Sequence, residues 1–336
     1  MSLQLNNRHI GSSTVLICAA VLMLMLPVLA AAQAVFNPKD WDGREGAGAK
    51  TWMAERAKLP PYTPARTADG RPDLQGRWGG TWSGDDIEEI PTFLDITTPP
   101  WESWISDPAN GKIPYQPWAA AEHNAHREGL GRESWSKDPT RRLYYDPQGF
   151  CMKSVPRYSQ RGYELVQTRD TVIMMLNWGH IYRVIPLDNR PHPASAVRMW
   201  MGSARGHFEG DTLVVETTNL NGKMWLDSGG NFIGPNAKVT ERIRLASPND
   251  LDYQATIDDP ETFTQPWTLT SRQRRQGAGG GPGGGGGGNA VRDPYAAESW
   301  EHACHEGNEE HEADIKKLGF KWYLPPEPPK RPAAGR

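Results

Sequence analysis

The chain has 336 residues, of which 37% are hydrophobic and 23% charged, and its formal net charge is −3. Its Lys and Arg residues form no basic patch of the kind that binds nucleic acid, so we expect no nucleic-acid partner. A chain of this length can bury a sizeable core. It contains 14 tryptophans but only 7 phenylalanines, which suits either core packing or ligand-facing surfaces.

Residues 1–34 have the pattern of a secretory signal peptide. Arg8 supplies a basic start, residues 14–30 are apolar, and small residues in "AAQA" predict cleavage after Ala34. Pro27 interrupts the apolar run, which is shorter than the roughly 20 residues that span a bilayer. We therefore expect a periplasmic or secreted protein with no membrane span in its mature chain. An uncleaved membrane anchor is the alternative.

Two cysteines, Cys151 and Cys304, remain once Cys18 is removed with the signal peptide. An even number of cysteines in an oxidising compartment favours a disulfide, so we expect these two to be bonded. A catalytic cysteine with a histidine partner is the alternative.

Residues 35–135 are expected to form an extended, irregular N-terminal arm that is rich in proline. Within the arm, "LQGRWGGTWSGD" is compatible with a short first strand. Residues 117–131 begin with Pro, continue with an Ala run and end with Gly. Those signals predict one short helix.

Residues 136–275 carry the strand pattern and are expected to form the core of the fold. Their short runs, bounded by turn residues, are rich in β-branched and aromatic side chains. No segment of helical period interrupts them, so an antiparallel meander is expected that closes into an up-and-down, lipocalin-like β-barrel. A sandwich is the alternative closure. The runs are "YELVQT", "TVIMMLNW", "IYRVIPL", "AVRMWMG", "DTLVVETTN", "KVTERIRL", "LDYQATI" and "FTQPWTLTSR".

The chain after the last strand divides into two parts. Residues 276–290 are a Gly-rich tract that is expected to be disordered, because it has almost no apolar surface to bury. It lacks the Lys-Ser/Thr ending of a phosphate loop. Residues 291–336 are expected to dock on the barrel through a short helix and to end in a Pro-rich tail.

Alternation along the strands indicates which side chains face inward. In "KVTERIRL", Glu241 shares a face with Val239 and Ile243, so we expect this carboxylate inside the barrel. The face of Glu216 is ambiguous, because both faces of its strand carry valine and threonine. A buried carboxylate requires a partner, and the candidate partners are Arg183, Arg198, Arg205 and His207.

Carboxylate and histidine pairs are the minimum for general acid–base chemistry. The catalytic candidates are therefore Glu216, Glu241, His207 and His305. Candidate ligand-binding residues are Arg205, Trp200, Trp225 and Glu306.

The stretch "ACHEGNEEH", residues 303–311, concentrates metal-binding residue types near the end of the chain. His302, His305 and His311 with Glu306 are compatible with a divalent metal, but the spacing is not the zinc motif H-E-x-x-H. The alternative is that His305 and Glu306 form hydrogen bonds around the disulfide. We therefore assign no metal site and expect no cofactor.

Several motifs together resemble a large, uncharacterised family of secreted bacterial proteins that is abundant in acidobacteria and some proteobacteria. They include "GRPDLQGRW", "DPQGFCMKSVPR", "GHFEGDTLVVETTNLNGKMWLD" and "HACHEGN". The resemblance implies a periplasmic β-rich domain and supplies no catalytic residues. Cys151 and Cys304 both lie inside these motifs. The chain departs from the family at "KSVPR", where "GVPR" is more common, and in its Gly-rich tract.

Three functions are compatible with this pattern. The first is a barrel that binds a small molecule in its mouth or interior. The second is a hydrolase or lyase whose carboxylate and histidine meet at the barrel mouth. The third is a structural or interaction protein. Titratable groups converging in a pocket favour the enzyme, an apolar cavity favours binding, and a filled barrel favours the structural protein. The sequence does not indicate the oligomeric state.

Overall fold

The computed structural model describes residues 48–80, 87–88, 102–129, 144–160, 162–176, 181–276 and 321–322. Several expectations fall on other parts of the chain and are not tested by it. These are the signal peptide, nearly all of the Gly-rich tract, the C-terminal helix, and the residues Cys304, His305 and Glu306.

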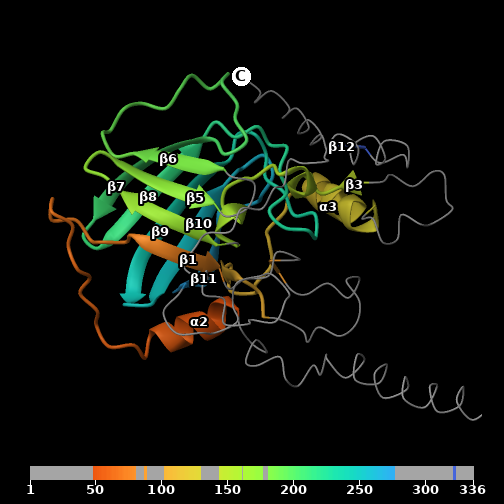
Figure 1. Ribbon diagram of the computed structural model, residues 1–336. Coiled ribbons are helices and arrows are strands. Elements are labelled where there is room, and N and C mark those ends of the chain that lie inside the picture. Colours follow the sequence, from red (N-terminus) through yellow and green to blue (C-terminus); the bar gives the residue numbers. More distant parts are fainter. Residues whose placement is uncertain are drawn as a thin grey trace, which may run out of the picture.

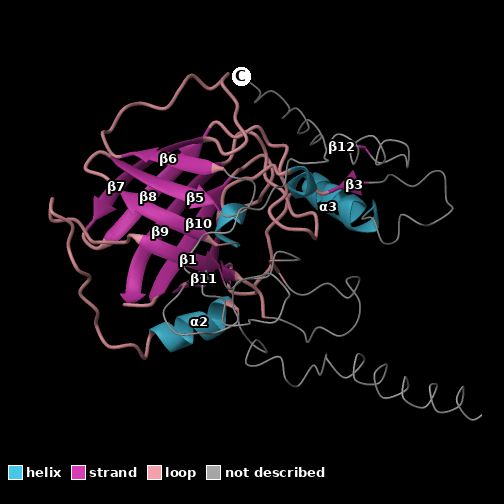
Figure 2. Cartoon of the chain, in the orientation of Figure 1, coloured by secondary structure: helices cyan, strands magenta, loops and turns pink. Residues whose placement is uncertain are grey.

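The protein is mainly β, and its antiparallel strands curl into a nearly closed barrel (Figures 1 and 2). The hydrogen-bonded order is β6-β5-β4-β1-β11-β10-β9-β8-β7, with the short β2 paired to β11. A parallel pair, β3 and β12, forms a separate small sheet. The strands are β1 Gly76–Gly80, β2 Ile105–Asp107, β3 Tyr144–Tyr145, β4 Tyr163–Gln167, β5 Thr171–Leu176, β6 Tyr182–Pro186, β7 Ser203–Glu209, β8 Thr212–Thr218, β9 Lys238–Ser247, β10 Asp250–Asp258, β11 Trp267–Arg275 and β12 Lys321–Trp322.

The barrel consists of two meanders that a strand from the N-terminal arm joins. Strands β4 to β6 form one meander and β7 to β11 form the other. Strand β1 lies between them, with Trp78 opposite both Tyr163 and Arg275. The antiparallel barrel expected from the sequence is confirmed. The expected single meander is interrupted, because the consecutive strands β6 and β7 are not hydrogen-bonded to each other.

Strands β6 and β7 are the two ends of this order, and they approach one another closely. Gly206 in β7 provides the space: a Cβ atom there would lie 2.7 Å from Ile185 Cγ2 and 2.9 Å from Leu187 Cδ2. A residue without a side chain therefore lets the two end strands pack together.

Two α-helices lie among the described residues. Helix α2, Ala49–Arg56, packs on the outer face of the sheet, where Trp52 Nε1 donates to Asp252 at 2.9 Å (Figure 1). Helix α3, Pro117–Gly129, confirms the helix predicted over residues 117–131. Neither helix is long and apolar enough to cross a membrane.

One large hydrophobic cluster fills the barrel and its ends. Alternate strand residues supply it, as the inward-facing Val239, Ile243, Tyr253 and Ile257 show. Two short 3₁₀ helices, η4 Pro147–Phe150 and η5 Arg157–Gln160, precede β4. Helix η5 carries Tyr158 into the same cluster.

Candidate functional site

A buried carboxylate, Glu241, lies inside the barrel among the apolar side chains. Its side chain is 0% exposed. The register places it opposite Val215 on β8 and Ala255 on β10. The inward direction predicted from alternation is confirmed.

The charge partner of Glu241 is Arg183 on β6. Arg183 Nη2 donates to Glu241 Oε2 at 2.5 Å and to Thr217 Oγ1 at 2.7 Å. The guanidinium also lies over the ring of Tyr158, with 5.0 Å between Cζ and the ring centroid. Burial lowers the pKa of Arg183, but the charge and hydrogen bond of Glu241 together with Tyr158 and Tyr253 outweigh burial and raise the pKa above its usual value. The guanidinium group therefore stays charged.

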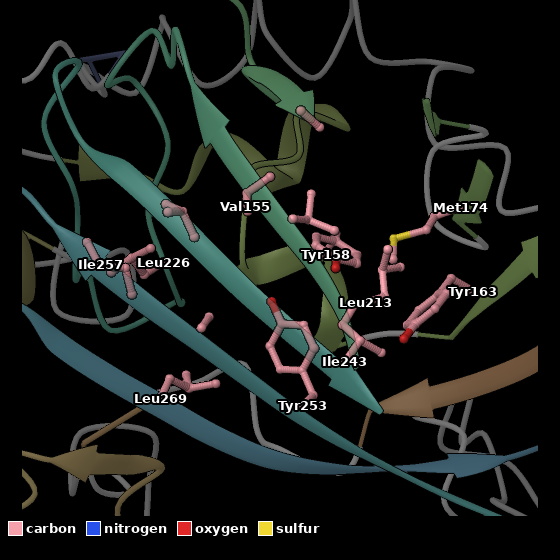
Figure 3. Packing of buried hydrophobic residues seen from close by; sticks show 14 of the residues in the cluster. Val155, Tyr158, Tyr163, Met174, Leu213, Leu226, Ile243, Tyr253, Ile257 and Leu269 are labelled. Atoms are coloured by element: carbon pink, nitrogen blue, oxygen red, sulfur yellow. The ribbon is translucent and has the colours of Figure 1, made fainter. Parts of the chain in front are cut away.

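Two tyrosine hydroxyls complete the site. Tyr158 donates to Glu241 Oε1 at 2.5 Å, and Tyr253 donates to the same oxygen at 2.8 Å. Figure 3 shows these two hydroxyls turned toward the same part of the interior. Burial raises the pKa of both tyrosines well above the usual value, and the negative charge of Glu241 raises it further. Both hydroxyls therefore stay protonated and act as donors.

Tyr158 reaches the interior because the segment before it is fixed in place. Arg157 Nη1 and Nη2 donate to the Asp146 carboxylate at 2.7 and 2.6 Å. Asp146 also caps η4 by accepting from the backbone NH of Gln148 at 2.9 Å. Because two charge-assisted bonds hold Arg157, the next residue has little freedom to leave the barrel.

Three polar atoms of inward-facing residues have no hydrogen-bond partner. They are Arg183 Nε, Ser271 Oγ and Gln273 Nε2, and each is buried. Ser271 and Gln273 face inward from β11, opposite Tyr253 and Leu251 of β10. The carbonyl oxygen of the Gln273 side chain accepts from the hydroxyl of Tyr163. Buried polar groups in native proteins are usually bonded to protein, to ordered water or to a ligand, so these three atoms are candidates for such a contact.

The expected pairing of His207 with a catalytic carboxylate is not found in the structure. His207 lies on the outer face of β7, where its Nε2 is 3.1 Å from Glu209 Oε1. Glu216 also faces outward and is ion-paired with Lys238. The reason is the strand period: Gly206 points inward, so both of its neighbours point outward.

The candidate ligand-binding residues do not gather around Glu241. Arg205 faces outward and donates from Nη2 to the carbonyl of Pro191 at 2.6 Å. Trp225 is buried in a second, smaller cluster with Phe232. Its ring stacks on His126, with centroids 4.9 Å apart. Trp200 is half-buried and belongs to neither cluster.

The cysteine and metal predictions are tested only in part. Cys151 is buried and disulfide-bonded. Its pairing with Cys304 stays a prediction, because Cys304 is outside the part of the chain that the structure describes. His305 and Glu306 lie outside it too. Over the described ranges, no group of three or more His, Cys, Asp or Glu side chains gathers to hold a metal ion.

The fold and the site define a class of protein: an antiparallel β-barrel with a charged, hydrogen-bonded cluster in its interior. No family model, no curated protein and no solved structure matches the chain. Membership of the secreted bacterial family therefore stays a prediction.

Proposed function

We propose that this protein is an exported barrel that binds a small polar molecule in its interior. The observation that supports the proposal is a set of buried polar atoms without a hydrogen-bond partner on inward-facing residues of β6 and β11: Arg183 Nε, Ser271 Oγ and Gln273 Nε2. They offer two donors and one hydroxyl, which suits a ligand with hydrogen-bond acceptors. The signal-peptide pattern of residues 1–34 supports export.

Leaving these three atoms unpaired lowers the stability of the folded chain. A buried polar group without a partner costs about 1–3 kcal/mol. Three such groups in one barrel are a sizeable cost for a domain whose net stability is on the order of 5–15 kcal/mol. A ligand or an ordered water that pairs with them removes that cost. Ligand binding would then stabilise the folded chain.

The geometry favours binding over acid–base catalysis. Glu241 already accepts from Arg183, Tyr158 and Tyr253, so its oxygens are engaged. Both tyrosines have raised pKa values, through burial first and the Glu241 charge second, which makes them donors and not bases. The interior groups are therefore suited to holding a molecule in one orientation.

Native mass spectrometry of the protein purified from a periplasmic fraction tests the proposal. We expect a co-purified small molecule that is lost from Ser271→Ala, because that variant removes one of the unpartnered atoms. The matched control is Thr268→Val on the same strand. The hydroxyl of Thr268 is 2.9 Å from that of Thr256, away from the interior, so this variant should keep the molecule.

The free energy of unfolding distinguishes a ligand-binding barrel from a barrel whose interior binds nothing. If the interior binds nothing, Ser271→Ala removes an unpaired hydroxyl and should raise the free energy of unfolding of the purified protein. That result, together with no bound mass in the wild-type protein, would overturn the proposal. Recovery of the chain with residues 1–34 still attached and only in the cytoplasm would overturn the export part.

A further inference from the structure

A polar hollow of about 150 Å³ lies on the outer face of the barrel, away from the Glu241 network. It is formed by the last residue of helix α2 and by residues of strands β8, β9 and β10. Its lining residues are Arg56, Thr212, Arg242, Arg244, Asp252 and Gln254.

Strand register brings two arginines into this hollow. Ile243 is buried in the barrel, so Arg242 and Arg244 on either side of it face outward. On the neighbouring strand β10, Asp252 lies opposite Arg244 and Gln254 lies opposite Arg242.

A buried carboxylate fixes two of the three guanidinium groups. Asp252 has a side chain that is only 3% exposed. It accepts from Arg56 Nη1 at 2.5 Å and from Arg244 Nε at 3.2 Å, as well as from the indole of Trp52. One carboxylate therefore positions both arginines, and each keeps further N–H donors that this contact does not use.

The hollow has an excess of positive charge. Three arginines line it against one carboxylate, Asp252. Glu209 adds a second carboxylate at the edge, 2.9 Å from Arg242, and one positive charge still remains. Thr212 and Gln254 add side chains that can donate neutral hydrogen bonds.

We propose that this hollow binds an oxyanion of the phosphate class, free or as the end group of a larger solute. The planar guanidinium groups match the spacing of phosphate oxygens and can donate in pairs. Because Asp252 holds Arg56 and Arg244 in place before binding, little side-chain freedom is lost when the anion arrives.

Titration of the full chain with inorganic phosphate at constant ionic strength, followed by ³¹P line broadening, tests the site. We expect saturable binding that Arg244→Gln weakens by about tenfold, the effect of losing one charge-assisted contact. Arg242→Gln should weaken binding in the same direction. The matched control is Arg190→Gln, which changes an exposed arginine paired with Asp188 and should leave binding unchanged.

A second arm separates the two sources of the anion. Phosphatidylglycerol vesicles are compared with phosphatidylcholine vesicles in co-sedimentation with the wild-type and Arg244→Gln chains. Loss of vesicle binding in the variant supports a lipid headgroup, whereas phosphate binding without vesicle binding supports a free anion. Equal behaviour of Arg244→Gln and Arg190→Gln in both arms would overturn the proposal. The interior site is unaffected by either result, because none of its residues lines this hollow.

Discussion

At the scale of single residues, Glu241 and Arg183 place a buried ion pair in the otherwise largely apolar interior of the barrel. Taking two charges out of water carries a large desolvation cost, which the pair offsets only if its geometry is good and its other atoms are bonded. Glu241 meets both conditions through Tyr158 and Tyr253. Arg183 meets them only in part, since its Nε has no partner.

Removing the charge of Glu241 should therefore strongly destabilise the protein. Glu241→Gln keeps the side-chain size but leaves Arg183 as an uncompensated buried cation, and breaking one partner of a buried pair costs about 3–5 kcal/mol. The control is Glu216→Gln, which breaks the exposed pair with Lys238 and should cost about 1 kcal/mol or less. Urea unfolding at pH 7 measures both. Equal costs would contradict the buried ion pair.

The buried environment of His123 lowers the pKa of its imidazole. It lies buried on α3, and its ring stacks on Tyr115 with centroids 5.3 Å apart. Burial lowers the pKa of His123 from 6.5 to about 3, and the charges of Arg127 and His126 add to this effect. The folded protein therefore holds this histidine in its neutral form.

Stability should fall with pH because of this histidine. In the unfolded chain His123 becomes protonated below about pH 6.5, whereas in the folded protein it stays neutral down to about pH 3. The free energy of unfolding should thus decrease as pH falls through this window, by up to about 1.4 kcal/mol per unit. His123→Phe should flatten the dependence between pH 7 and 5 in urea unfolding, whereas His207→Phe, on the exposed face, should not. Parallel pH profiles for wild type and His123→Phe would contradict the assignment.

At the scale of elements, the sequence predicts the strands well because burial on one face imposes a period of two. That period placed Glu241 inside, and the rule that buried charges are paired placed Arg183 among its candidate partners. The same period, applied to Ala204, Gly206 and Phe208, identifies the apolar face of β7. It therefore puts Arg205 and His207 on the outer face, whereas the residue types alone favoured an interior site.

Helix α2 shows what sequence patterns miss. It has no side-chain cap of its own, and only Ala49 and Trp52 are buried. A residue distant in the sequence caps it: Glu102 Oε2 accepts from the backbone NH groups of Gly48 and Thr51 at 3.2 and 3.0 Å. Tertiary contacts of this kind leave no local pattern, so the arm was expected to be irregular where it forms a helix.

The interior polar residues Tyr158, Ser271 and Gln273 were not predicted, for a related reason. Tyr158 comes from a short 3₁₀ helix before the first long strand, and no periodic pattern indicates that it enters the barrel. Ser271 and Gln273 occupy inward positions of β11 that would ordinarily be apolar. Sequence patterns find an amphipathic strand by its apolar face. They do not find a site where polar side chains occupy that face.

At the scale of the whole molecule, the barrel depends on contacts between segments far apart in the chain. Strand β1, from the N-terminal arm, joins the two meanders, and Trp78 contributes a buried side chain to the core. On the opposite side, β6 and β7 approach by side-chain packing around Gly206. The interior site needs both junctions, because Arg183 comes from β6 while Glu241 comes from β9.

The approach of β6 and β7 can be tested by filling the space at Gly206. A Cβ there would lie 2.7 Å from Ile185 Cγ2 and 3.6 Å from Leu213 Cδ1, so Gly206→Val must push the two strands apart. Overpacking of this kind costs about 1–3 kcal/mol.

The matched control is His207→Val. It introduces the same side chain one residue along the strand, on the exposed face, and should change the free energy of unfolding by no more than about 0.5 kcal/mol. Urea unfolding compares the two, and ligand binding by the interior should weaken only in Gly206→Val, because displacing β6 moves Arg183 away from Glu241. If both variants unfold at the wild-type urea concentration, β6 and β7 do not close the barrel as described.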